Sequence, residues 1–282
     1  MKKPPMKNYR DYKLLVFIKM RTLRRIVGHA EFFTLLRWPI DTVKLSNPRF
    51  HKCCLRGLTG LKLIIAGCEY AGKTTLLGEV KKWAEGAMGG VFGGHDHFTF
   101  PCKECPEEER KKLLALGPST REMFQRYMME YHLAPFEDEK DHVLVGFHVE
   151  EAVYAPLYYG YGRPGEFGDR QWLARHIDRK LMKHFPGIVL VLVKASPDEI
   201  AKRMKENPHP DGVLKEGDIE HVLKRFEEEY RHSLIYPRFV LDTTGLTAEE
   251  TLKQFVESMV PHLEPIDILR MLNYEKLKKQ FT

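Results

Sequence analysis

The sequence lacks the long apolar runs of a membrane protein and the dense cysteines of a small secreted domain. Its longest apolar runs, such as LLVFI and GIVLVLV, fall far short of the roughly 18 residues that a bilayer-spanning helix needs. Only 5 cysteines occur in 282 residues, and this does not resemble the disulfide framework of a secreted domain. The start, MKKPPMKNYRDY, has no continuous apolar stretch of a secretory signal. These absences favour a globular protein of a reducing compartment, the cytoplasm or the mitochondrial matrix.

Acidic residues are scarce near the start of the chain. Residues 1–60 hold 14 of the 45 Lys and Arg residues but 3 of the 39 Asp and Glu residues, a net charge of +11, and the remainder has a net charge of −5. In LLVFIKMRTLRRIV, apolar residues recur at helical spacing. We expect a basic amphipathic arm that docks on a protein partner or an anionic surface, with nucleic acid ranked last. A solvated or locally packed extension is the other interpretation.

From Leu61 onward, short apolar runs alternate with charged segments of helical periodicity. The runs are LKLIIAG, GGVFGG, DHVLVGFHV, GIVLVLVKA and RFVLDTT. Strands that alternate with helices indicate a parallel sheet covered on both faces. The pattern predicts an α/β three-layer sandwich with five parallel strands over residues 61–262, between the arm of residues 1–60 and a tail of residues 263–282. Ser196 and Thr247 begin S/T-x-x-E boxes, which predict helix starts after the fourth and fifth strands.

The most specific motif is GCEYAGKTT, which follows the first predicted strand and precedes a helical segment. In a G-x-x-x-x-G-K-T loop, backbone N–H groups converge on phosphate oxygens, the lysine reaches the β- and γ-phosphates and the threonine binds Mg²⁺. We therefore expect ATP and Mg²⁺ as cofactors, with Lys73 on the phosphates and Thr74 on the metal. The predicted nucleotide-binding residues are Gly67, Cys68, Glu69, Tyr70, Ala71, Gly72, Lys73, Thr74 and Thr75.

The segment GGHDHFTFPCKEC permits two interpretations. Asp96 comes at the end of the second strand, at the edge where open α/β sheets bind ligands. A carboxylate there accepts the proton of an attacking hydroxyl or helps to hold Mg²⁺ through water. Alternatively, the segment supplies four zinc ligands, His95, His97, Cys102 and Cys105. Because this spacing matches no common zinc finger and the single C-x-x-C lacks a second pair, we favour Asp96 as a catalytic base that contacts the acceptor.

The segment DHFTFP resembles the D-x-F-x-x-P segment of small-molecule P-loop kinases such as uridine kinase and nicotinamide riboside kinase. In those kinases this aspartate serves the acceptor hydroxyl. Residues 61–262 are also similar in layout to thymidylate and deoxynucleoside kinases, which carry an acidic–arginine pair after the third strand. Glu150 and Glu151 stand there instead. The resemblance implies that Glu150 holds Mg²⁺ and Glu151 contacts the acceptor, while the missing arginine argues against a nucleoside monophosphate acceptor.

Two later segments carry further candidates. In APLYYGYGRPGEFGDRQW, Tyr158, Tyr159 or Tyr161 offers a ring for stacking, and Arg163 offers a cation to an anion. The segment DEIAKRMKENPHPDGVLKEGD resembles the start of a kinase lid. In such a lid, Arg203 would bring a positive charge to the transferring phosphoryl group.

The favoured prediction is an ATP- and Mg²⁺-dependent kinase that transfers the γ-phosphoryl group to a hydroxyl of a nucleoside-like or other small acceptor. Lys73, Asp96 and Arg203 are its predicted catalytic residues. A second hypothesis is a kinase-fold accessory subunit of a large assembly, for example mitochondrial respiratory complex I, with structural or regulatory nucleotide binding. A third is a nucleic-acid-directed kinase whose basic arm binds phosphates.

Overall fold

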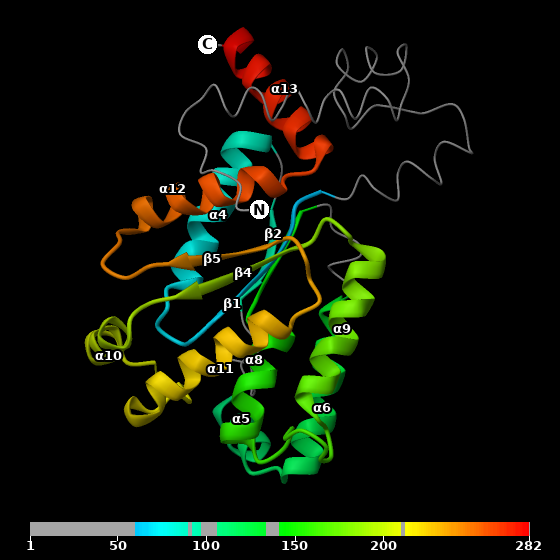
Figure 1. The fold of residues 1–282 in the computed structure, drawn as a ribbon, viewed down its shortest axis with the longest axis vertical. Coiled ribbons are helices and arrows are strands. Elements are labelled where there is room, and N and C mark those ends of the chain that lie inside the picture. The colour runs from blue at the N-terminus through cyan, green and yellow to red at the C-terminus, as the bar shows by residue number, and fades with distance from the viewer. Residues whose placement is uncertain (1–59, 90–91, 97–105, 134–140, 210–211, 282) are drawn as a thin grey trace.

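A single parallel sheet forms the centre of the computed structural model, which describes residues 60–89, 92–96, 106–133, 141–209 and 212–281. Its strand order is β2-β3-β1-β4-β5 (Figure 1). The strands are β1 Lys62–Gly67, β2 Gly93–Asp96, β3 His142–Val145, β4 Val189–Lys194 and β5 Arg238–Asp242. The predicted five-stranded parallel sheet is confirmed.

Helices cover both faces of this sheet. On one face α12 and α13 pack against α4, and on the other α9 and α11 pack against α8 (Figure 1). The helices are α4 Lys73–Met88, α5 Glu107–Leu114, α6 Pro118–Tyr131, α8 Phe147–Tyr154, α9 Arg170–His184, α10 Pro197–Glu206, α11 Ile219–His232, α12 Ala248–Met259 and α13 Pro265–Phe281. Short helical turns are η3 Ala155–Tyr159, η4 Glu216–Asp218 and η5 Val260–His262. The expected three-layer α/β sandwich is therefore confirmed.

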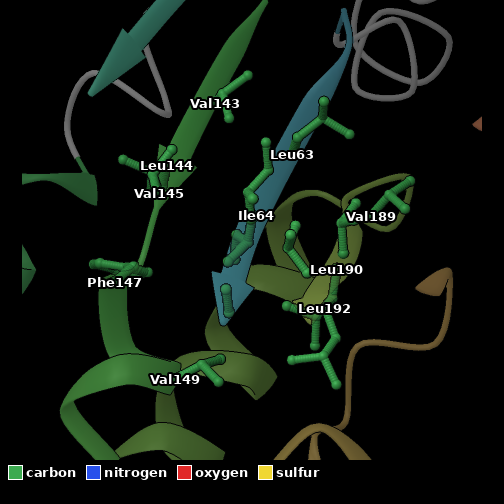
Figure 2. Packing of buried hydrophobic residues seen from close by; sticks show 14 of the residues in the cluster. Leu63, Ile64, Val143, Leu144, Val145, Phe147, Val149, Val189, Leu190 and Leu192 are labelled. Carbon is green, nitrogen blue, oxygen red and sulfur yellow. The ribbon is translucent and has the colours of Figure 1, made fainter. Parts of the chain in front are cut away.

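The core consists of the apolar side chains of the three central strands and of the helix faces that pack on them. Every residue of β1 and β3 is buried, because a parallel strand covered on both faces has no solvent side. Ile64, Leu144 and Leu190 pack together in the middle of the sheet and are at most 1% exposed (Figure 2). Burial of each such side chain contributes about 1.5–3 kcal/mol.

The strand register brings four strand ends to one edge of the sheet. Asp96 of β2 pairs with Val145 of β3, and Gly67 of β1 pairs with Val193 of β4. A Cβ atom on Gly67 would lie 2.1 Å from the carbonyl oxygen of Val193, so this approach of β1 to β4 requires glycine. Residues that directly follow these strands therefore share the carboxyl edge.

The third strand is shorter than its apolar run suggested. Gly146 and Phe147 have φ angles of +82° and +53°, which turn the chain out of the sheet and start α8 at Phe147. Glu150 and Glu151 consequently lie within α8 and not at the strand end. The helix carries both carboxylates over the sheet edge.

The structure also places the predicted helix starts and the tail. The Ser196 hydroxyl accepts the Glu199 N–H, and Thr247 forms a full capping box with Glu250, which confirms both predicted caps. Within the segment predicted as a tail, α13 packs on α4. The arm of residues 1–59 lies outside the described residues. No described helix has both the length and the apolar character that crossing a bilayer demands.

Candidate nucleotide and acceptor site

The phosphate loop joins β1 to α4. Gly72, with φ +91°, precedes α4 and gives it no side-chain cap, so the cap residue leaves the first N–H groups of the helix available to an anion. Tyr70 is one of two described non-glycine residues with positive φ. Such a backbone geometry costs about 1–3 kcal/mol and persists only where surrounding contacts hold it.

Two side chains donate hydrogen bonds to the backbone carbonyl groups of the phosphate loop. The Lys73 ammonium donates to the carbonyl oxygens of Gly67 and Cys68 at 2.8 and 2.9 Å. The Thr243 hydroxyl donates to the carbonyl of Ala71 at 2.9 Å. These bonds fix the loop in the form in which its N–H groups can converge on phosphate oxygens.

Lys73 also forms an ion pair across the site. Its ammonium lies 3.0 Å from Oε1 of Glu150, and both side chains are buried. Thr74 follows Lys73 and is exposed at the start of α4. A carboxylate and a hydroxyl beside a phosphate loop are hard oxygen ligands of the kind that Mg²⁺ prefers, so these residues fit the expected metal.

Asp96 lies at the same edge, as the last residue of β2, as the sequence indicated. The structure describes its backbone, so its role as a base stays a prediction. The zinc interpretation falls outside the described residues, apart from the backbone of His95. Within the described part of the chain, no group of three His, Cys, Asp or Glu residues could hold a metal.

Glu151 belongs to a buried ion cluster that the sequence did not reveal. Nε of Arg170 lies 3.0 Å from Glu151, and Nη1 of Arg170 lies 2.7 Å from Glu122 on α6. The Tyr161 hydroxyl donates to Glu151 at 3.4 Å. Burial raises the pKa of Glu151, and the Arg170 charge partly offsets this rise. An acidic–arginine pair thus exists in space, although its arginine comes from α9.

The glycines of GYGRPGEFGDR were the available signal for this cluster. A Cβ atom on Gly168 would lie 2.5 Å from Cγ of Glu122, and one on Gly162 would lie 2.7 Å from Cγ of Arg170. Both glycines also have positive φ. Close backbone approach to a buried side chain explains why glycine is needed at both positions.

Gln125 is a second residue that the sequence analysis missed. It lies one helical turn after Glu122 on α6 and is 1% exposed. A carboxamide offers both a donor and an acceptor to a planar ligand.

Three other predicted site residues, Tyr158, Arg163 and Arg203, differ in their exposure and in their hydrogen-bond partners. The Tyr158 hydroxyl donates to Asp218 at 2.9 Å, and Arg163 is exposed. Arg203 donates to the carbonyl oxygens of Tyr70 and Thr243 at 3.1 and 2.8 Å. Arg203 therefore supports the phosphate loop from outside, and its role at the phosphoryl group stays a prediction.

Cys68 in the loop is not suited to nucleophilic chemistry. Its side chain is fully buried, and burial raises its pKa to about 12. A nucleophilic cysteine needs an accessible thiolate. Cys68 is therefore a packing residue of the loop.

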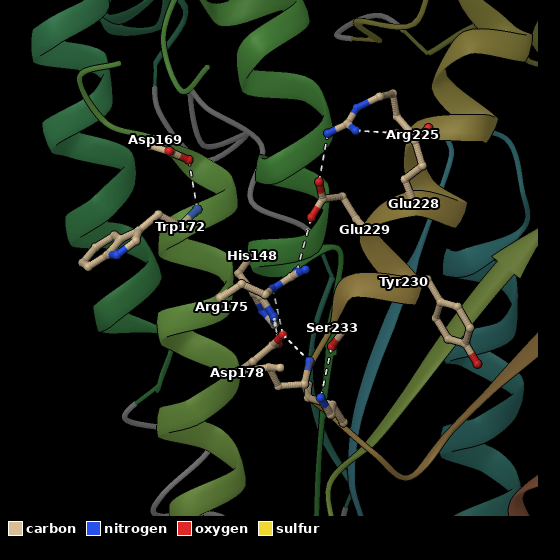
Figure 3. Close-up of polar contacts among 12 residues, drawn as sticks. His148, Asp169, Trp172, Arg175, Asp178, Arg225, Glu228, Glu229, Tyr230 and Ser233 are labelled. Atoms are coloured by element: carbon tan, nitrogen blue, oxygen red, sulfur yellow. Dashed lines mark hydrogen bonds and ion pairs between the residues drawn. The ribbon is translucent and has the colours of Figure 1, made fainter. Parts of the chain in front are cut away.

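A second polar cluster supports α8 from behind. His148 on α8 lies 2.7 Å from Asp178 on α9, and Arg175 joins Asp178 to Glu229 of α11 (Figure 3). Burial alone would raise the pKa of Asp178, but the His148 hydrogen bond and nearby charges leave it lowered. The cluster ties three helices together and fixes the helix that carries Glu150.

Comparisons with known proteins found no matching family model and no matching curated protein. Similar solved structures include a deoxyadenosine kinase from M. mycoides with bound dATP, at 17% identity and TM-score 0.48, over 71% of this chain and 99% of that chain. A thymidylate kinase from Candida albicans is similar at 14% identity and TM-score 0.48, over 72% of this chain and 94% of that chain. These are distant likenesses. The sheet order and the phosphate loop between β1 and α4 give this chain a P-loop type of α/β fold.

Proposed function

We propose that this protein is an ATP- and Mg²⁺-dependent kinase that phosphorylates a hydroxyl of a nucleoside-like or other small acceptor. The observation that carries the proposal is the buried contact of Lys73 with Glu150 at the mouth of the phosphate loop. This contact places a cation for phosphate oxygens beside a carboxylate suited to Mg²⁺, at the edge of the sheet where β2 ends in Asp96.

MgATP, when bound, supplies the transferable phosphoryl group. Lys73 and the loop N–H groups would hold its phosphates, and Thr74 and Glu150 would hold the metal. Asp96 would accept the proton of the acceptor hydroxyl while the hydroxyl oxygen attacks the γ-phosphoryl group. Catalysis of this kind depends on positioning and on stabilisation of negative charge.

The acceptor class is inferred from buried polar side chains of α6, α8 and α9. The Gln125 amide supports a planar acceptor with its own donors and acceptors, as a nucleobase has. The Arg170 guanidinium is engaged by Glu122 and Glu151, which agrees with an acceptor that carries no phosphate. Glu151 would contact a polar group of this acceptor.

The test is ATP consumption by the purified protein with a panel of nucleosides, nucleotides and small polyols. We expect turnover on one acceptor, and we expect Asp96→Asn to lower it by about 10²- to 10⁴-fold because the general base is lost. Asp198→Asn, at an exposed aspartate on α10, is the matched control and should leave turnover unchanged. Unchanged turnover in Asp96→Asn would refute the assignment of the base.

A kinase-fold subunit of an assembly is the second candidate. An exposed apolar face on α6 favours it, because apolar residues that gather on one exposed face mark interaction sites. The exposed residues are Met123, Phe124, Tyr127 and Tyr131. Purification in a stable complex, with ATP bound and no acceptor turned over, would support this candidate over the enzyme.

A further inference from the structure

Two side chains of the phosphate loop contact a segment that lies about 140 residues further along the sequence. The Glu69 carboxylate accepts the N–H groups of Val213 and Leu214 at 3.1 and 3.3 Å. The Tyr70 hydroxyl accepts the N–H of His209 at 3.0 Å, and the two rings stack with centroids 4.3 Å apart. Both contacts connect the loop to the chain between α10 and η4.

The Glu69 carboxylate is buried and accepts hydrogen bonds from two backbone N–H groups. Glu69 is 8% exposed, and a carboxylate is buried at a cost in free energy unless donors satisfy it. Its two oxygens each take one of two consecutive backbone N–H groups, an arrangement that binds anions well. A Cβ atom on Gly212 would lie 3.1 Å from Oε2 of Glu69, so the segment approaches the carboxylate closely.

The same loop residues are held from two other elements. The Glu69 N–H donates to the Tyr154 hydroxyl of α8 at 2.9 Å, and Arg203 of α10 donates to the Tyr70 carbonyl. The outer bend of the loop is therefore fixed by α8, by α10 and by the segment Gly212–Leu214. These contacts explain how Tyr70 keeps its positive φ.

We propose that Glu69 is a positioning residue for the phosphoryl transfer proposed above, on which this inference rests. Its carboxylate fixes Gly212–Leu214 against the outer side of the phosphate loop. The loop then keeps the shape that aligns the phosphates with the acceptor. Glu69 acts through this backbone segment and does not contact the acceptor.

The first test needs no nucleotide and is independent of kinase activity. Trypsin can cleave after Lys215, an exposed residue next to the fixed segment. We expect Glu69→Ala to be cleaved there about tenfold faster than the wild type, since local release exposes the bond. Glu206→Ala, at an exposed carboxylate that ends α10, should be cleaved at the wild-type rate. Equal rates for Glu69→Ala and the wild type would overturn the proposal.

The second test changes the donor side of the contact. Val213→Pro removes one N–H that Glu69 accepts, while Val213→Ala keeps it and serves as control. With the acceptor found in the panel, we expect Glu69→Ala and Val213→Pro each to lower kcat about tenfold, with KM for the acceptor unchanged. The double variant should lose little more than either single variant.

The alternative is that Glu69 contacts the acceptor itself. In that case Glu69→Ala would raise KM for the acceptor, Val213→Pro would act like Val213→Ala, and the two effects would multiply. That pattern would overturn the positioning role. Failure of the proposed function would look different, because the wild type would then turn over no acceptor while the trypsin result still stood.

Discussion

The Lys73 ammonium is shared between a carboxylate and two carbonyl oxygens. It contacts Glu150 at 3.0 Å and the carbonyls of Gly67 and Cys68 at 2.8 and 2.9 Å. The same group that is proposed to bind phosphates therefore stabilises the loop and neutralises a buried anion. Its removal has consequences for stability as well as for activity.

We expect Lys73→Met to lower the free energy of unfolding by about 3–5 kcal/mol, because Glu150 is then buried without its cation. The double variant Lys73→Met, Glu150→Gln should lose clearly less, since the uncompensated charge is gone. Denaturant unfolding of both variants measures this. A double variant as unstable as the sum of the single losses would contradict the coupling.

Local patterns predicted some residues of the site and missed others. The phosphate loop is contiguous, so spacing alone identified Lys73 and Thr74. Arg170 and Glu122 meet across 48 residues of sequence, and no local pattern reports such a pair. The arginine that is missing next to Glu150 in the sequence is therefore supplied in space by Arg170 of α9, which pairs with Glu151.

At the scale of elements, the apolar strands were predictable because burial on both faces leaves continuous apolar runs. The start of α8 was not predictable, since it depends on the positive φ of Gly146 and Phe147. The bounds of β2 were missed for a similar reason: its residues, GGHD, have no apolar run, and pairing with β3 defines them. Tertiary pairing and backbone turns thus fixed what side-chain patterns left open.

Helix α13 contains a carboxyl group that makes stability depend on pH. Burial raises the pKa of Asp267 to about 7, Arg270 opposes this rise, and Asp141 and Glu264 add to it. Arg270 also pairs with Asp141, which accepts the Leu61 N–H, so α13 is tied to the start of two strands. The ionised form of Asp267 is the one that the fold disfavours.

A raised pKa contributes stability that is fully present below the ordinary value of 3.8 and is lost as the pH rises through about 7. We expect the free energy of unfolding to fall by about 2–4 kcal/mol between pH 4 and pH 8 through this group. In Asp267→Asn this part of the fall should disappear. Denaturant unfolding at several pH values measures the free energy of unfolding of both proteins. Parallel pH profiles for the wild type and Asp267→Asn would refute the contribution of Asp267.

At the scale of the whole molecule, nucleotide binding should stabilise the entire fold, because the phosphate loop joins the central strand to α4. At a MgATP concentration 100 times Kd, we expect about 2.7 kcal/mol of stabilisation. For a chain of this size, Tm should rise by about 5 to 10 °C. Thermal unfolding with and without MgATP measures the shift.

Lys73→Ala should show a much smaller shift at the same MgATP concentration, because the cation for the phosphates is lost. Glu206→Gln, at an exposed carboxylate that ends α10, should shift like the wild type. An equal shift in Lys73→Ala would mean that the nucleotide binds elsewhere.

The position of β1 in the sheet order has a consequence for biosynthesis. Leu63 of β1 pairs with Val143 of β3 and Val189 of β4, so the central strand leaves the ribosome long before either partner. Until β3 has been translated, KLIIAG has no partner strand, and until β4 has been translated one edge of it stays unpaired. Long-range parallel pairing of this kind is slow and leaves the nascent chain open to aggregation. We therefore expect chaperones that bind apolar segments to bind this nascent chain during translation.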